Sequence, residues 1–414
     1  MVNIAKKAGK RDREAPCPIM RACGGCEWLG LPYRKQLARK QTAMEELFRP
    51  FIQVDDIVPD PSSIPVEGRE GARLISPRAF RYKAATPFAP GPHKTVRSGF
   101  FERGSHRITP CPACAVEAPG ARRILDGVAR LAERLGISAY DEDKDRGTLR
   151  HAVVRMGWKS NEALVTIVTR QKAVPRLQEL AEAVMGLDAR IVGVAQNVNP
   201  RRTNAILGGE TIVLRGEARM RDSLLGCTFE ISPVSFYQTN PAQTEALYSL
   251  AIEGMALHDG DTLMDAYCGS GTIGLCTAAA ARDAGKRISL IGVERNPEGV
   301  RDAMRNAELN NLAGHSAFKA QDATEFMRRA VADGLRIDVL SMDPPRAGST
   351  PEFLAAAAAL NPRRISYISC NPETQARDLR TLAVNGYRLL RLTPVDMFPH
   401  TAHVETVAVM ERAR

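Results

Sequence analysis

The sequence has 414 residues, 44% of them hydrophobic and 25% charged, which is an ordinary globular composition and more chain than one core usually covers. No run of about 18 apolar residues is present, which excludes a membrane-spanning helix. The basic, polar N-terminus excludes a secretory signal, so we expect a cytoplasmic protein of at least two domains.

Positive charge is concentrated in the first part of the chain. The net charge is +10, but residues 1–250 carry 38 Lys and Arg against 27 Asp and Glu, whereas residues 251–414 carry 19 against 20. A basic module joined to a neutral one is typical of a polyanion-binding domain attached to a catalytic domain. The alternative is a basic surface that is merely solvated, and charge alone favours neither.

The N-terminal region begins with a basic stretch, residues 1–15, which we expect to be a flexible tail. Three cysteines follow as Cys17-x5-Cys23-x2-Cys26. The chain has nine cysteines, and an odd number in a cytoplasmic protein argues against a disulfide framework. The tight spacing instead predicts a metal site, which needs a fourth ligand, and Cys111 and Cys114 both qualify.

The predicted helices and strands fall into two regions that differ in how these elements alternate. Residues 27–50 have helical spacing, and from residue 80 to about 235 short β-rich runs alternate with turns, interrupted by one helical segment at 172–186. This pattern predicts an α+β domain with a mainly antiparallel sheet. After residue 240 strands alternate with helices, which predicts a doubly wound parallel sheet. The expected strands are 262–267, 288–294, 337–343, 365–370 and 403–412, and the expected helices are 241–257, 272–284, 297–311, 351–360 and 373–384.

The stretch DAYCGSGTIGL, residues 265–275, joins a strand to a helix and predicts a nucleoside site. Gly269 and Gly271 allow the backbone to pass close to a ligand. Glu294 ends the next strand, where a carboxylate can accept hydrogen bonds from both ribose hydroxyls. The spacing suits S-adenosylmethionine (SAM) or a dinucleotide, and the incomplete glycine pattern argues against pyrophosphate binding.

Two further loops carry candidate chemistry. Asp343 opens the sequence DPPR, whose two prolines stiffen the turn after a strand. This motif looks like the substrate-site motif of methyltransferases that act on planar nitrogen or ring groups. Cys370 ends a β-branched run and is followed at once by Asn371 and Pro372, which end the strand. A thiol is therefore expected at the carboxyl end of a strand, where open α/β sheets bind their ligands.

Six motifs, in the same order as in the family, together resemble the RNA uracil-C5 methyltransferases, and most closely the bacterial 23S ribosomal RNA enzymes that carry an iron–sulfur cluster. The motifs are CPIMRACGGCEWL, SFYQTNP, DAYCGSGTIGL, DPPRAG, SCNPETQARDL and DMFPHTAHVE. The resemblance implies a C-terminal α/β Rossmann-like class I methyltransferase domain, residues 236–414. It also implies a preceding α+β domain, residues 16–235, which carries the cluster loop and binds RNA.

The resemblance also implies roles for single residues. Cys370 would be the nucleophile that forms a covalent adduct with C6 of uracil, and Glu405 would be the base. Tyr267 stands where relatives usually have Phe. The residues expected to bind SAM are Gln238, Tyr267, Thr272, Glu294, Asp322 and Asp343.

For the cysteines, the residues alone favour a structural zinc ion, whereas the resemblance favours a [4Fe–4S] cluster held by Cys17, Cys23, Cys26 and Cys114. Cys114 is chosen over Cys111 because Pro119 stands five residues after it, as in the family. Bacterial relatives that act on transfer RNA usually lack these cysteines, so the resemblance favours 23S rRNA as the substrate. We further expect no N-terminal OB-like domain, since only 16 residues precede Cys17.

The leading function is thus SAM-dependent methylation of a uridine in 23S rRNA by a monomer that binds neither DNA nor a membrane. The alternatives are the same chemistry on tRNA, cytosine-C5 methylation, or a non-catalytic rRNA-binding assembly protein. His400 and His403 flank Glu405 and are expected to orient the loop or contact RNA rather than bind a metal. The cations expected to bind RNA phosphates are Arg81, Lys83, Arg97, Arg103, Arg146 and Arg150.

Overall fold

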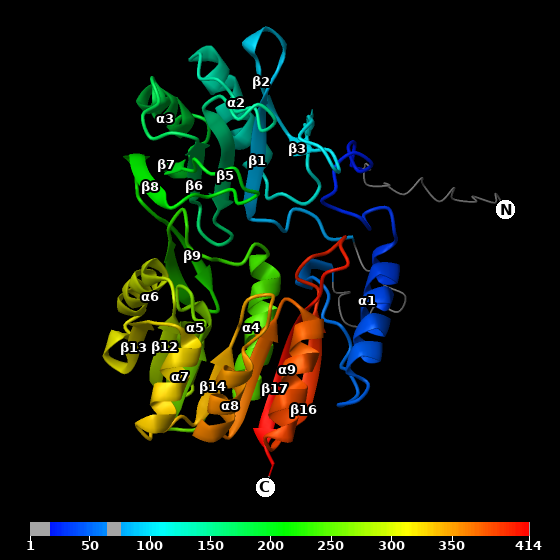
Figure 1. Ribbon diagram of the computed structural model, residues 1–414, viewed down its shortest axis with the longest axis vertical. Coiled ribbons are helices and arrows are strands. Elements are labelled where there is room, and N and C mark those ends of the chain that lie inside the picture. The colour runs from blue at the N-terminus through cyan, green and yellow to red at the C-terminus, as the bar shows by residue number, and fades with distance from the viewer. Residues whose placement is uncertain (1–16, 64–75, 414) are drawn as a thin grey trace, which may run out of the picture.

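The computed structural model describes residues 17–63 and 76–413, so the expected tail, residues 1–15, lies outside the described part. The molecule has two lobes stacked along its long axis (Figure 1). The upper lobe is formed mainly by the central part of the chain, and the lower lobe is formed mainly by the C-terminal part.

The upper lobe is built on a six-stranded sheet in the order β2-β1-β5-β6-β7-β8. All neighbouring strands are antiparallel except β6 and β7, which the crossover helix α3 connects. Helices α2 and α3 pack on the sheet over an apolar core. The predicted mainly antiparallel α+β domain is therefore present. The bounds are β1 (Lys83–Pro90), β2 (Val96–Ser98), β5 (Leu149–Met156), β6 (Ala163–Thr169), β7 (Ile191–Val198), β8 (Glu210–Gly216), α2 (Ala121–Arg134) and α3 (Leu177–Met185).

Helix α2 is absent from the sequence-based prediction, which expected only one helix in this region. Its middle residue, Gly127, weakens the helical signal of the sequence. The structure explains the glycine, because a Cβ atom there would lie 2.7 Å from the side chain of Leu187. Close packing of α2 therefore requires a residue that local propensity disfavours.

Short elements complete the two lobes. These are the 3-10 turns η1 (Pro61–Ser63) and η2 (Pro92–Lys94), the pair β3 (Phe100–Phe101) and β4 (Ile108–Thr109), and the hairpin β9 (Met220–Leu224) and β10 (Cys227–Ile231). The hairpin buries Leu224 and Phe229 in the same core as Leu275 of the lower lobe. It therefore belongs by packing to the lower lobe.

The lower lobe contains a seven-stranded sheet in the order β13-β12-β11-β14-β15-β17-β16. The first five strands are parallel, and β17 lies antiparallel between β15 and β16. This confirms the predicted doubly wound sheet. The strands are β11 (Thr262–Ala266), β12 (Ser289–Glu294), β13 (Ser316–Ala320), β14 (Val339–Met342), β15 (Arg364–Ser369), β16 (Tyr387–Val395) and β17 (Glu405–Arg412).

Helices cover both faces of this sheet (Figure 1). They are α4 (Pro241–Met255), α5 (Thr272–Asp283), α6 (Pro297–Leu309), α7 (Ala323–Ala332), α8 (Pro351–Leu360) and α9 (Pro372–Val384), with a 3-10 turn η3 (Ala313–His315). The sequence-based prediction omitted β13, α7 and β16. Strand β13 and much of β16 are not fully buried, so they lack the continuous apolar run that marked the other strands.

Helix α1 (Tyr33–Phe48) packs beside α9 of the lower lobe, although it comes from the N-terminal region (Figure 1). Its residue Phe48 is buried in the same core as Tyr367, and the segment that follows α1 pairs with β16 through Val58 and Val395. The sequence-based boundary between residues 235 and 236 does not coincide with this packing. The change in the order of predicted strands and helices shows where one domain pattern ends. It does not show which sheet, distant in sequence, an N-terminal helix packs against.

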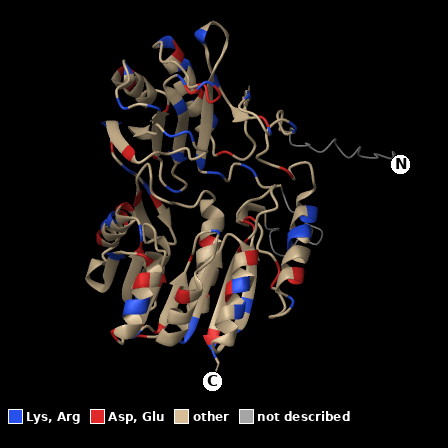
Figure 2. Ribbon diagram, in the orientation of Figure 1, with Lys and Arg blue, Asp and Glu red and all other residues tan. Residues whose placement is uncertain are grey.

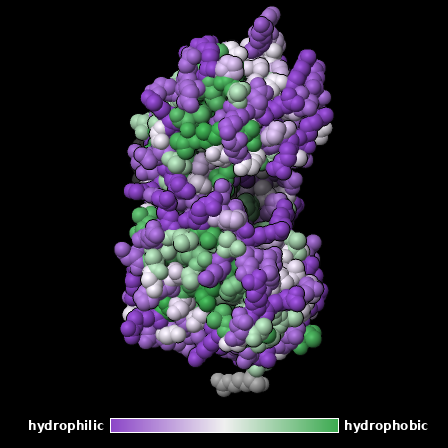
Figure 3. All heavy atoms as spheres, turned by 60° about the vertical axis from the view of Figure 1, so that its left-hand side comes forward, coloured by the Kyte–Doolittle hydropathy of each residue, from purple (hydrophilic) through white to green (hydrophobic). Residues whose placement is uncertain are grey.

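Figure 3 shows hydrophilic side chains over much of one face of the molecule, with hydrophobic patches on both lobes. Within the described ranges, no helix has the length and apolar character needed to cross a membrane.

One of the six cations expected to bind RNA, Arg150, is not at the surface. Arg150 is 1% exposed and pairs with Glu142, because β5 is buried on both faces.

Candidate active site

A cavity of about 670 Å³ opens at the carboxyl ends of the parallel strands of the lower lobe. Loops that follow β11, β12, β14 and β15 contribute to its wall, as does the first residue of β17. Seven of the eight residues expected to bind SAM or to act in catalysis line it, and they are Gln238, Tyr267, Glu294, Asp322, Asp343, Cys370 and Glu405. This volume lies in the range of ligand-binding pockets.

Thr272 is the predicted site residue that does not line the cavity. It begins helix α5 and is buried, and its hydroxyl lies 2.9 Å from the hydroxyl of Tyr248. The structure therefore gives Thr272 a contact within the protein.

The glycine loop after β11 forms one wall. Gly269 and Gly271 both have positive φ angles, of 54° and 78°, which the chain needs in order to turn from the strand into helix α5. Tyr267 also has a positive φ, and its ring packs 5.3 Å from the ring of Phe353. Its hydroxyl lies 3.3 Å from that of Ser349, so the polar atom absent from a phenylalanine has a partner.

Glu294 lies at the end of β12 beside this loop. One carboxylate oxygen accepts a 3.1 Å hydrogen bond from the amide of Gly269, and the other accepts a 2.7 Å bond from the amide of Asn296. These bonds fix the carboxylate at the cavity wall. A carboxylate has further lone pairs, so it can still accept hydrogen bonds from a pair of hydroxyls.

Asp322 caps helix α7, where its side chain accepts hydrogen bonds from the amides of Thr324 and Glu325 at 3.0 and 3.2 Å. Both bonds use the same oxygen, Oδ1. Asp322 thus stabilises the N-terminus of helix α7 as its N-cap. Its second carboxylate oxygen can accept a hydrogen bond from a ligand in the cavity.

Asp343 follows β14, and its side chain has no hydrogen-bond partner among the described residues. Burial and the nearby carboxylates of Glu405 and Asp265 raise the pKa of Asp343 well above its ordinary value. Several carboxyl groups thus lie close together in a poorly hydrated place. They cannot all be ionised at neutral pH without a cationic partner.

Cys370 follows β15 and is partly exposed to the cavity. Burial, together with the nearby carboxyl groups of Glu405 and Asp343, raises the pKa of the Cys370 thiol to about 11. The guanidinium of Arg346 opposes this effect and lowers the pKa. Because the thiol is neutral at pH 7, it must lose its proton when it attacks a substrate.

Glu405 is the first residue of β17 and is only 3% exposed. Its carboxyl group makes no hydrogen bond or ion pair within the described part of the chain. Burial raises the pKa of Glu405 to about 7. A carboxyl group with a pKa near the operating pH is well suited to act as a general base.

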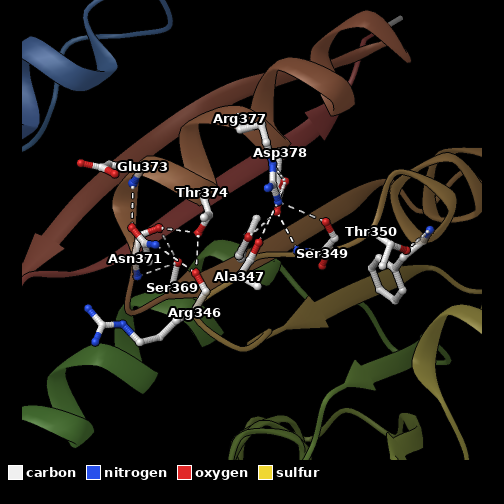
Figure 4. Close-up of polar contacts among 12 residues, drawn as sticks. Arg346, Ala347, Ser349, Thr350, Ser369, Asn371, Glu373, Thr374, Arg377 and Asp378 are labelled. Carbon is white, nitrogen blue, oxygen red and sulfur yellow. Dashed lines mark hydrogen bonds and ion pairs between the residues drawn. The ribbon is translucent and has the colours of Figure 1, made fainter.

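A hydrogen-bond network joins the loop of Cys370 to the loop of Asp343 (Figure 4). Asn371 caps helix α9 and donates a 2.9 Å bond to the carbonyl of Arg346, and Thr374 donates to the same carbonyl. Farther along, Asp378 accepts a 2.8 Å bond from the amide of Ser349. The side chain of Arg346 points away from these contacts (Figure 4), and it lines the cavity.

Sequence reasoning did not assign roles to two prominent cavity residues. Phe236 is 66% exposed, although it is large and apolar, and it stands at the cavity next to Gln238. Arg346 belongs to the DPPR motif, but only its aspartate was singled out. Their motifs, SFYQTNP and DPPRAG, were quoted for the resemblance, but only the structure shows that both residues line the cavity.

The four cysteines expected to bind a cluster lie near one another. Burial is the main cause that raises the pKa values of Cys23 and Cys26, and the charges of Cys17 and Cys114 raise both further. Cys111 also lies beside this group, because its interaction with the Cys114 thiol is the main cause that raises the pKa of Cys111. Within the described chain, no three Cys, His, Asp or Glu side chains are grouped as a single metal ion requires.

Among the residues that the structure describes, His400 and His403 are not grouped with Glu405 as ligands of one metal ion would be. His400 is fully buried, and both of its ring nitrogens have protein partners, Gln36 and the carbonyl of Pro77. This confirms the expectation that His400 orients its loop.

Comparison with known proteins gives a consistent result. Residues 142–413 match the tRNA (uracil-5-)-methyltransferase family. An uncharacterised RNA methyltransferase of Halalkalibacterium halodurans is 39% identical over 96% of this chain and 83% of its own length. A second uncharacterised RNA methyltransferase, from Bacillus cereus, is 36% identical over 97% of this chain and 83% of its own.

Among solved structures, the chain is similar to the Pyrococcus abyssi tRNA (uracil-54, C5)-methyltransferase in complex with S-adenosyl-L-homocysteine. The TM-score is 0.74 at 26% sequence identity, and the match covers 94% of this chain and 86% of the other. The similarity therefore extends over both lobes.

Proposed function

This chain belongs to the RNA uracil-C5 methyltransferase family, and from that premise we propose that it methylates C5 of a specific uridine in 23S rRNA, forming 5-methyluridine. SAM-dependent methylation of RNA with a class I α/β fold follows from the family itself. The observation that carries the proposed mechanism is that one cavity is lined by the Cys370 thiol, the Glu405 carboxyl group and Asp343.

The cavity suits SAM as the methyl donor. A fixed carboxylate, Glu294, stands beside the glycine loop for the ribose, and Asp322 and Gln238 line the same space. When bound, SAM supplies an electrophilic methyl group on sulfur. The side chains of the protein must make the weakly nucleophilic C5 of uracil reactive and later remove its proton.

Cys370 starts the reaction by forming a bond from its sulfur to C6 of uracil. The electrons of the C5–C6 double bond move onto the ring as an enolate, so that C5 becomes nucleophilic. When bound, SAM would supply the methyl group that C5 takes up, and the electron pair of the broken methyl–sulfur bond would stay on the SAM sulfur. The raised pKa of Cys370 means that its proton leaves on attack. The proton passes to solvent, because Cys370 is partly exposed, and the positive charge of Arg346 favours that loss.

Glu405 completes the reaction. After methylation C5 carries both a methyl group and a hydrogen. Glu405 accepts this proton, the C5–C6 double bond forms again, and the sulfur of Cys370 leaves. Its pKa of about 7 allows it to be ionised before the step and protonated after it.

The roles of Cys370 and Glu405 are tested with three variants. Cys370→Ala should bind SAM and RNA but transfer no methyl group. Glu405→Gln should methylate once and then stall, leaving an RNA–protein adduct that survives a denaturing gel. The matched control, Cys370→Ala/Glu405→Gln, should form no adduct. Activity in Cys370→Ala, or normal turnover without adduct in Glu405→Gln, would show that the assigned roles are wrong.

The choice of 23S rRNA rests on the resemblance carried by the cysteine motif. The family name and the Pyrococcus neighbour refer to tRNA, so tRNA is the second candidate substrate. Mapping of 5-methyluridine in a deletion strain decides between them. Loss of one mark from 23S rRNA supports the proposal, whereas loss from tRNA alone supports the second candidate.

Cys17, Cys23, Cys26 and Cys114 are proposed to hold a [4Fe–4S] cluster. Support comes from the closeness of these thiols, since the charges of Cys17 and Cys114 raise the pKa values of both Cys23 and Cys26. Anaerobically purified protein should be brown and contain about four irons. A colourless, active protein with one zinc ion would exclude the cluster.

A further inference from the structure

The loop between β16 and β17, residues 396–404, leads directly into Glu405. It has no regular secondary structure, so side-chain contacts must determine its shape. Many of these contacts come from helix α1 and the segment before it, which lie beside this loop (Figure 1).

Lys40 of α1 makes the central contact. It is 1% exposed, and its ammonium group donates to the carboxylate of Asp396 at 2.5 Å, to the carbonyl of Phe398 at 3.2 Å and to the carbonyl of His403 at 2.8 Å. An ammonium group has three donors, and all three are used here. One side chain therefore holds both ends of the loop.

A second contact holds the middle of the loop. His400 has a positive φ of 66°, which the loop must maintain against local strain. Its amide donates to the side-chain oxygen of Gln36 at 3.0 Å, and its carbonyl accepts a 2.9 Å bond from the amide of Trp28. Tyr33 donates to the second oxygen of Asp396 at 2.7 Å. Four side chains or amides of the N-terminal segment thus fix one loop.

Glu405 is placed from two sides, because its backbone pairs with Val395 of β16 and it directly follows the loop 396–404. Its carboxyl group has no hydrogen-bond partner in the described chain, so the backbone and packing alone place it. It stands two residues after His403, whose carbonyl Lys40 holds. We propose that Lys40 is a positioning residue for Glu405, acting through the loop 396–404. The inference rests on the proposed function, in which Glu405 removes the C5 proton.

The cost of the buried ion pair supports this role. Removing two charges from water costs free energy that their attraction often fails to offset, and well-packed apolar residues of similar volume are frequently as stable. Apolar residues at positions 40 and 396 would therefore be enough if the only role of these two side chains were to hold α1 in place. Two backbone carbonyls and a carboxylate, however, can be held together only by a group with several donors.

The test uses a variant that removes both charges together. Lys40→Met alone leaves Asp396 buried without its cation, which is strongly destabilising and can unfold the protein. Lys40→Met/Asp396→Asn keeps the shapes and the bond from Tyr33 but releases the two carbonyls. Lys35→Met is the matched control, because Lys35 is exposed on the same helix.

In single-turnover experiments, the double variant should bind SAM and form the RNA adduct normally. Release of the C5 proton should slow by about 10²-fold, as small misplacements of a catalytic group do, and adduct should accumulate on denaturing gels. Lys35→Met should release the proton at the unaltered rate. A merely structural role would lower SAM binding, adduct formation and proton release together.

Three results would overturn the inference. These are an unfolded double variant, a parallel loss of SAM binding, or proton release at the unaltered rate. Glu405→Gln, measured alongside, separates this failure from that of the proposed function. If Glu405→Gln traps adduct and the double variant does not, only the role of Lys40 is wrong. If Glu405→Gln turns over normally, Glu405 is not the base that removes the C5 proton. The proposed positioning role of Lys40 is then wrong as well.

Discussion

At the scale of single residues, Glu405 combines deep burial with a position next to a thiol and other carboxyl groups. Sequence motifs identify Cys370, Asp343 and Glu405 as candidates, because each follows or begins a strand in a recognisable context. They do not reveal that the carboxyl group of Glu405 lacks a hydrogen-bond or ion-pair partner in the described chain, or that burial raises its pKa to about 7. These properties arise from packing against residues far away in the sequence.

The raised pKa predicts how the reaction depends on pH. Glu405 accepts a proton only as the carboxylate, so the rate of C5 proton release should rise with pH through about 7 and then level off. At about pH 6 only about one tenth of Glu405 is ionised. Release of tritium from C5-labelled RNA in single turnovers measures this step. A release rate that is constant between about pH 6 and 8 would contradict the role of Glu405.

The same shift predicts a pH-dependent effect on stability. The pKa of Glu405 rises from an ordinary 4.5 to about 7 on folding, so its stabilising effect is complete below the ordinary value and is lost as pH rises through 7. Glu405→Gln should therefore gain stability relative to the parent protein as pH increases, by up to roughly 3 kcal/mol. Urea unfolding of both proteins at about pH 5.5 and 8.5 checks this. An unchanged difference between them would show that the pKa is not raised.

At the scale of elements, the sequence predicts best where one local signal dominates. The strands β11, β12, β14 and β15 were predicted from apolar runs that end in turn residues. Helix α2 was missed because Gly127 is required by its contact with Leu187, and β13 because it is largely exposed. Such elements depend on tertiary contacts, which residue patterns along the chain do not contain.

The cap of helix α9 is predicted to serve both stability and catalysis. Asn371→Ala removes the cap and the bond to the carbonyl of Arg346, which ties the Cys370 and Asp343 loops together. It should cost about 1 kcal/mol of stability and also lower kcat. Asn296→Ala is the matched control, since Asn296 caps α6 without such a bond between loops. It should lose similar stability while kcat stays near the parent value. Equal kcat values for the two variants would show that the tie between the loops has no catalytic effect.

At the scale of the whole molecule, chemistry lies in the lower lobe, while the excess of positive charge lies in the first 250 residues. The sequence predicts this division of charge. It does not predict that helix α1, which lies in the N-terminal region of the sequence, packs on the lower lobe. It also cannot distinguish an exposed cation from a buried one. Three of the predicted cations are exposed, namely Arg97, Arg103 and Arg146. Arg150 is buried and forms an ion pair with Glu142.

The exposed arginines of the upper lobe allow a direct test of where RNA binds (Figure 2). Arg97 and Arg146 are exposed and have no ion-pair partner within the described residues. If each contacts a phosphate, Arg97→Glu/Arg146→Glu should weaken RNA binding and reduce the slope of log affinity against log salt by about 1.4 for a single strand. SAM binding should not change, because neither residue lines the cavity.

A matched charge reversal on the lower lobe separates local contact from the effect of net charge. Lys319→Glu/Arg328→Glu alters the same number of charges at exposed positions on β13 and α7. A long-range effect of net charge would weaken RNA binding equally in both double variants, because it depends on total charge and not on position. Phosphate contacts at Arg97 and Arg146 would instead reduce the salt slope only in the upper-lobe variant. Equal slopes in all three proteins would therefore show that the upper lobe is a solvated basic surface and that RNA is bound elsewhere.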